Sequence, residues 1–106
     1  MPRALVVEDE VHIRDLIALH LGLNGLEVDA VGDGRAGLAR SRERGYDLVV
    51  LDIMLPGLDG LSVCRAIRHE GRNADVPILM PRQRYNASPA SAPHCPNRPY
   101  VRPKWI

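Results

Sequence analysis

Apolar runs separated by amphipathic segments define the first 80 residues of the chain. The runs at residues 4–7 and 48–51 are continuous, which is typical of strands buried on both faces of a parallel sheet. Residues 26–31 alternate apolar and polar side chains, which indicates a half-buried strand near a sheet edge. A fourth apolar run, at residues 78–80, follows Pro77 and predicts a further strand.

Apolar residues at helical spacing fill the intervals between these strands. Gly25 is placed to end the first of these segments, and Gly45 to cap the second, which Gly37 weakens as a helix. Alternating strands and helices with short connections predict right-handed crossovers and an α/β, doubly wound parallel sheet covered on both faces. Helices are predicted at residues 13–21, 33–44 and 61–68.

The composition is that of an ordinary soluble domain. With 106 residues, 45% of them hydrophobic and 25% charged, the chain is long enough for one small domain. No apolar stretch approaches the roughly 20 residues of a membrane span. The N-terminus also lacks the apolar core and cleavage site of a signal peptide, so we expect a cytoplasmic protein without membrane contact.

The charge distribution changes abruptly after Met80. Residues 1–80 carry nine arginines and 13 acidic residues, whereas residues 81–106 carry five basic residues and no acidic one. This second segment shows no apolar periodicity, so we expect a proline-rich basic tail, either disordered or translated from a shifted reading frame. Its prolines occupy positions 81, 89, 93, 96, 99 and 103.

Acidic residues follow two of the predicted buried strands. Glu8 and Asp9 come directly after the first strand, and Asp52 comes directly after the third. If these strands are neighbours, the carboxylates converge at the carboxyl edge of the sheet, where α/β proteins bind ligands. Crowded carboxylates suit Mg²⁺, and one beside the ion can attack phosphorus as a nucleophile. Solvated strand-end residues without a chemical role remain the alternative interpretation.

Three motifs together resemble the receiver domain of bacterial two-component response regulators, and are most similar to receivers that precede winged-helix DNA-binding domains. The motifs are VVEDE at residues 6–10, LDIMLPGLDG at residues 51–60 and VPIL at residues 76–79. The resemblance extends from about Ala4 to Met80. It implies a flavodoxin-like sheet with strand order 2-1-3-4-5, here expected to be incomplete at the fifth strand and the last helices.

The resemblance also implies the roles of individual residues. Asp52 matches the phosphoacceptor, and Glu8 and Asp9 match the acidic pair that holds Mg²⁺ with it. Met54 matches the position whose backbone carbonyl joins the metal. By this resemblance the chain is not an enzyme but a phosphorelay module of transcription regulation, which takes phosphate from a sensor histidine kinase.

The resemblance fails after Met80. Pro81, Arg82 and Gln83 stand where a receiver continues to its Thr or Ser, and Lys104 follows Pro103 where the family's lysine precedes a proline. A truncated, non-switching receiver remnant that acts only as an interaction module is therefore the alternative function. A missing fifth strand would leave the fourth at an open edge, so we expect a homodimer or a strand-exchanged oligomer. No DNA-binding domain is recognised, so we expect no direct DNA binding by this chain.

Overall fold

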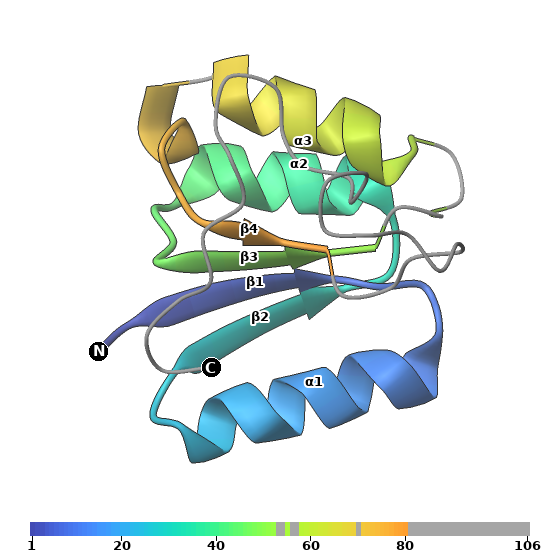
Figure 1. The fold of residues 1–106 in the computed structure, drawn as a ribbon, viewed down its shortest axis with the longest axis vertical. Coiled ribbons are helices and arrows are strands. Elements are labelled where there is room, and N and C mark those ends of the chain that lie inside the picture. The colour runs from blue at the N-terminus through green and yellow to red at the C-terminus, as the bar shows by residue number, and fades with distance from the viewer. Residues whose placement is uncertain (53–54, 56–57, 70, 81–106) are drawn as a thin grey trace, which may run out of the picture.

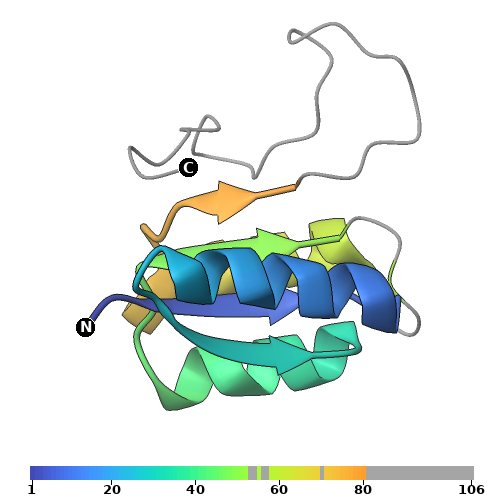
Figure 2. The ribbon, with the colours of Figure 1, turned by 90° about the horizontal axis from the view of Figure 1, so that it is seen from below.

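The computed structural model describes residues 1–52, 55, 58–69 and 71–80. Within them, four parallel strands form one sheet in the order β2-β1-β3-β4. Helix α1 covers one face of this sheet, and α2 and α3 cover the other (Figures 1 and 2). In chain order the elements are β1 (Arg3–Val7), α1 (Val11–Leu23), β2 (Glu27–Val31), α2 (Gly34–Glu43), β3 (Leu48–Leu51), α3 (Gly60–His69), the 3₁₀ helix η1 (Gly71–Asn73) and β4 (Ile78–Leu79).

This architecture confirms the predicted α/β fold and the order of its first four strands. The continuous apolar run at Leu48–Leu51 is β3, with β1 on one side and β4 on the other, and all four of its residues are buried. The half-buried pattern predicted an edge position for β2, and β2 does lie at one edge of the sheet. The fifth strand of the family's sheet would fall beyond Met80, outside the described residues. Within the described residues, no helix is long and apolar enough to cross a membrane.

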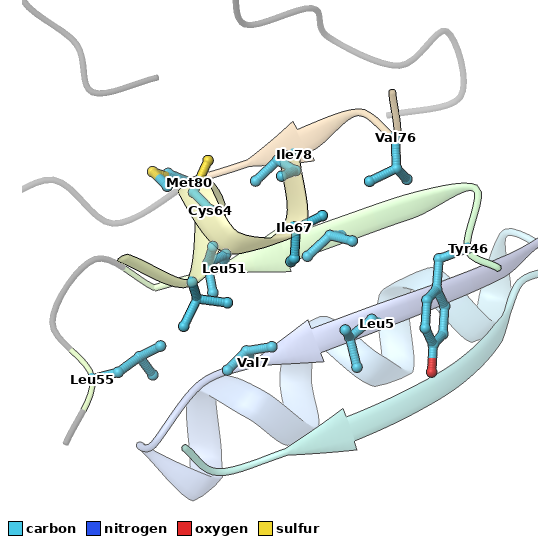
Figure 3. Packing of buried hydrophobic residues seen from close by; sticks show 12 residues of the cluster. Leu5, Val7, Tyr46, Leu51, Leu55, Cys64, Ile67, Val76, Ile78 and Met80 are labelled. Atoms are coloured by element: carbon cyan, nitrogen blue, oxygen red, sulfur yellow. The ribbon is translucent and has the colours of Figure 1, made fainter. Parts of the chain in front are cut away.

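Two apolar clusters hold the helices on the two faces of the sheet. Because side chains alternate along a strand, Val49 and Leu51 face α3 while Leu48 and Val50 face the α1 side. The larger cluster, between the sheet and α2 with α3, appears in Figure 3. Its buried members are Leu5, Val7, Tyr46, Val49, Leu51, Leu55, Val63, Cys64, Ile67, Val76, Ile78 and Met80.

Glycine is required where α2 crosses β1. A Cβ atom at Gly37 would lie 2.6 Å from Cγ2 of Val7, so the residue that weakens the helix allows it to approach the sheet. Asp33 caps the start of α2 by accepting a 2.8 Å hydrogen bond from the Ala36 amide. The expectation that Gly45 caps the other end is wrong: Gly45 follows the extended C-cap residue Arg44 but lacks the positive φ of a left-handed glycine cap.

The side chain of Asn73 links η1 by hydrogen bonds to the segment before β3. Its side-chain oxygen accepts a 2.8 Å hydrogen bond from the Tyr46 amide, and its side-chain nitrogen donates to the carbonyls of Ser41, at 2.6 Å, and Arg44, at 3.0 Å. Asn73 is itself only 4% exposed. One buried amide group therefore ties η1 to the end of α2 and to the segment that enters β3.

Candidate functional site

The register between β1 and β3 brings two acidic residues side by side. Val7 pairs with Leu51 in the parallel ladder, and the Asp52 amide donates a 3.0 Å hydrogen bond to the Val7 carbonyl. Glu8 and Asp52 are the next residues on the two strands. Both therefore leave the sheet at its carboxyl edge, where parallel α/β sheets bind their ligands.

Three carboxylates converge at this edge. Glu8, Asp9 and Asp52 each offer a carboxylate oxygen within 4.8 Å of the others. Glu8 is 3% exposed and Asp52 2% exposed, whereas Asp9 faces solvent. Buried carboxylates are costly without compensating charge, and oxygen-only donors of this kind fit a hard divalent cation. The donor set is thus suited to Mg²⁺, which commonly keeps several waters and takes one or two protein carboxylates.

Hydrogen bonds fix the loop that presents Glu8. The Glu8 amide donates to the Val31 carbonyl at 3.1 Å, and its carboxylate Oε2 accepts from the Glu10 amide, also at 3.1 Å. Glu10 has a different role from its neighbours: it caps α1, with Oε1 accepting a 3.0 Å bond from the His12 amide. The cap explains why α1 begins at Val11, two residues before the apolar periodicity predicted.

The segment after β3 is described only in part. Met54, the predicted carbonyl ligand, lies outside the described residues, as do Pro81 and Lys104. Leu55 is buried in the core that faces α3. Asp59 then precedes α3 and accepts hydrogen bonds from the Ser62 amide, at 2.9 Å, and the Ser62 hydroxyl, at 3.0 Å, which together lower the pKa of its carboxyl group.

The start of α2 makes a close contact that the sequence did not reveal. A Cβ atom at Gly34, the first residue of α2, would collide with the Leu58 carbonyl and lie 2.9 Å from Cγ2 of Val63. Gly34 therefore lets the start of α2 meet the loop between β3 and α3. Because its partners are more than 20 residues away, only the glycine itself could have hinted at this contact.

Comparison with known protein families matches residues 4–88 to the response regulator receiver domain. The chain belongs to this family. Among curated relatives, the transcriptional regulator RpaA of Synechocystis is 41% identical over 80 residues, covering 76% of this receiver chain and 33% of RpaA. SphR of Synechococcus elongatus, an alkaline phosphatase synthesis regulator, is 48% identical over 87 residues, with 74% and 33% covered. The chain thus spans about a third of the length of these relatives.

Solved receiver structures share the fold. TrrA of Thermotoga maritima, a response regulator solved with Mg²⁺ and BeF, is 40% identical with a TM-score of 0.70, covering 76% of this chain and 68% of TrrA. The receiver domain of a Pseudomonas aeruginosa sensor histidine kinase, solved with magnesium in its active-site cleft, is 34% identical with a TM-score of 0.70; the match covers 73% of this chain and 63% of that one. These likenesses confirm the predicted receiver fold.

Proposed function

We propose that this receiver domain accepts a phosphoryl group on Asp52, with Mg²⁺ held by the carboxylates of Glu8, Asp9 and Asp52. The observation that carries the proposal is the convergence of these three carboxylates within 4.8 Å at the carboxyl edge of the sheet. Membership of the receiver family supports the same roles. The backbone carbonyl of Met54 completes the proposed ligand set.

The proposed transfer is a nucleophilic displacement at phosphorus. One carboxylate oxygen of Asp52 forms a bond to phosphorus while the bond from phosphorus to the donor's leaving atom breaks, and that atom keeps the electron pair. Mg²⁺, when bound, neutralises the negative charge of the phosphoryl oxygens. The protein's contribution is positioning: β3 holds Asp52 at its end, and the β1–α1 loop holds Glu8 beside it.

The proposed phosphate donor is a sensor histidine kinase, in keeping with a receiver of two-component signalling. A phosphoryl group adds a charge of about −1.5 to −2 near neutral pH, which is enough to shift the equilibrium between two conformations of a surface. RpaA is a DNA-binding regulator by name, but the match covers only a third of it. For this chain, we propose signalling through protein contacts.

Phosphorylation with a small donor tests the proposed function. We expect incubation with acetyl phosphate and MgCl₂ to add the mass of one phosphoryl group in intact-protein mass spectrometry. The adduct should disappear in Asp52→Asn and in samples containing EDTA. Asp47→Asn is the matched control, because Asp47 is an exposed acid at the opposite end of the same strand. A folded wild-type protein that gains no adduct would refute the proposed function and favour the interaction module.

We also propose that the chain self-associates. β4 is a two-residue strand at an edge of the sheet that the described residues form, and unpaired edges promote strand addition. Helix α1 adds apolar surface, since Leu16, Leu19 and Leu23 are 54%, 57% and 75% exposed. Light scattering coupled to size-exclusion chromatography should show a homodimer or a larger strand-exchanged species. A monodisperse monomer at high concentration would contradict this.

A further inference from the structure

Arg14 lies beside the loop that carries the acidic site. It belongs to the first turn of α1, and its Nη1 donates a 3.3 Å hydrogen bond to the backbone carbonyl of Glu8. The side chain is half-buried. The contact spans six residues and bridges from α1 back to the end of β1, so it closes the loop that contains Asp9 and Glu10.

The same guanidinium lies against Gly32, directly after β2. A Cβ atom built on Gly32, the residue that follows β2, would lie 2.8 Å from Nη1 of Arg14. Glu8 is joined to this strand as well, because its amide donates to the Val31 carbonyl. Gly32 therefore leaves the space in which the Arg14 side chain reaches the Glu8 carbonyl.

These contacts hold the Glu8 residue from three directions. Its amide is bound to β2, its carboxylate accepts from the Glu10 amide, and its carbonyl accepts from Arg14. We infer that Arg14 is a positioning residue of the acidic site, which fixes the Glu8–Asp9 segment in its cation-binding geometry through the Glu8 main chain. This inference rests on the proposed function, because it concerns the same three carboxylates.

Charge and geometry predict opposite effects of removing Arg14. If the guanidinium acted only as a positive charge near three carboxylates, its loss would strengthen the binding of a divalent cation. If it positions the loop, its loss should weaken binding, and loss of residues that orient metal ligands typically costs about 10- to 100-fold in metal affinity. The direction of the change in affinity therefore decides between the two roles.

Mn²⁺ is a suitable probe because it shares the preference of Mg²⁺ for carboxylate and water oxygens. Binding is measured from the loss of the free Mn²⁺ signal in electron paramagnetic resonance. We expect Arg14→Leu to weaken Mn²⁺ binding roughly 10-fold. Arg14→Lys, which keeps the positive charge and can still donate a hydrogen bond, should recover part of that loss. Arg65→Leu, which removes an exposed arginine from the middle of α3, is the matched control and should bind like wild type.

Gly32→Ala tests the geometry without removing the arginine. Gly32 does not need a left-handed backbone, so the added methyl group must displace only the end of the Arg14 side chain. We expect Gly32→Ala to weaken Mn²⁺ binding in the wild-type background and to have no further effect in Arg14→Leu. Equal effects of Gly32→Ala in both backgrounds would show that the two residues do not act together, and would overturn the inference.

The phosphorylation rate gives a second readout. With acetyl phosphate, the rate for Arg14→Leu should fall at limiting Mg²⁺ and return to within about threefold of wild type at saturating Mg²⁺, since the loss is in metal affinity. Unchanged or tighter Mn²⁺ binding by folded Arg14→Leu would refute the positioning role. Failure of the wild type to bind Mn²⁺ or accept phosphate would instead refute the proposed function itself.

Discussion

Replacing Asn73 with alanine tests what holds β3 in place. The substitution removes three hydrogen bonds at once: one accepted from the Tyr46 amide and two donated to the Ser41 and Arg44 carbonyls. Asn73 is 4% exposed, so water does not readily replace the lost partners. The variant should therefore be strongly destabilised although no apolar contact of the core is cut away.

The size of the effect follows from these groups. Each hydrogen bond between neutral groups contributes about 1 kcal/mol net, and a buried donor left without a partner costs a further 1 to 3 kcal/mol or so. Three bonds and the unpaired Tyr46 amide together give about 4 to 6 kcal/mol. Because a domain of this size is stable by only about 5 to 15 kcal/mol, Asn73→Ala removes a large fraction of the free energy of unfolding.

Urea unfolding followed by far-ultraviolet circular dichroism measures this loss. Asn24→Ala is the matched control, because Asn24 is exposed and its side chain makes one 2.9 Å hydrogen bond, to the His20 carbonyl. We expect the control to cost less than about 1 kcal/mol. A loss below about 1 kcal/mol in Asn73→Ala, with an unchanged slope of the unfolding free energy against urea concentration, would show that the Asn73 hydrogen bonds do not stabilise the fold.

Three further substitutions test separate parts of the fold by the same measurement. Gly37→Ala should lower the free energy of unfolding by about 1 to 3 kcal/mol, because the added methyl group collides with Val7. In a Val7→Ala background the same substitution should be nearly neutral, and an unchanged loss there would contradict the clash. Asp59→Ala should lower the free energy of unfolding by about 0.5 to 2 kcal/mol, because it removes the cap of α3. The difference from wild type should shrink as the pH falls below about 4, because the pKa of Asp59 is lowered in the folded protein and protonation removes this stabilisation. Burial and the hydrogen bond to Asp29 raise the pKa of Tyr46, so wild-type stability should fall as the pH rises above about 10, and Tyr46→Phe should lack that fall.

The apolar pattern predicted the strands well because strand burial is a local property. Residues 48–51 were predicted as a buried strand, and β3 has these bounds with all four residues buried. The acidic site was also predicted from the sequence, since neighbouring parallel strands that each end in a carboxylate bring these carboxylates together at one edge of the sheet. That the two strands are neighbours could be inferred only from the family resemblance, and the ladder between them confirms it.

The side-chain contacts that position the site and β3 could not be predicted from the sequence in the same way. Arg14 was a polar residue between apolar ones in a predicted helix, and nothing in that pattern shows that its side chain reaches back to the Glu8 carbonyl. Asn73 meets partners 27 to 32 residues away through its side chain. Such contacts depend on how whole elements dock, because a single polar side chain carries no periodic signal.

Polar contacts around β3 matter because the apolar pattern alone does not fix the register of this strand. A strand with one polar face resists a slip of one residue, since the slip would expose its whole apolar face. β3 is apolar on both faces, so a slip within Leu48–Leu51 exchanges one buried side chain for another. Polar side chains at its two ends supply the missing information. The Asp47 carboxylate accepts a 2.8 Å hydrogen bond from the Arg3 amide before the strand, and a slip would draw the carboxylate of Asp47 or Asp52 into the apolar sheet. The position of Asp52 beside Glu8 is therefore set by the polar side chains at the strand ends, while the apolar run supplies the stability that keeps the strand in the sheet.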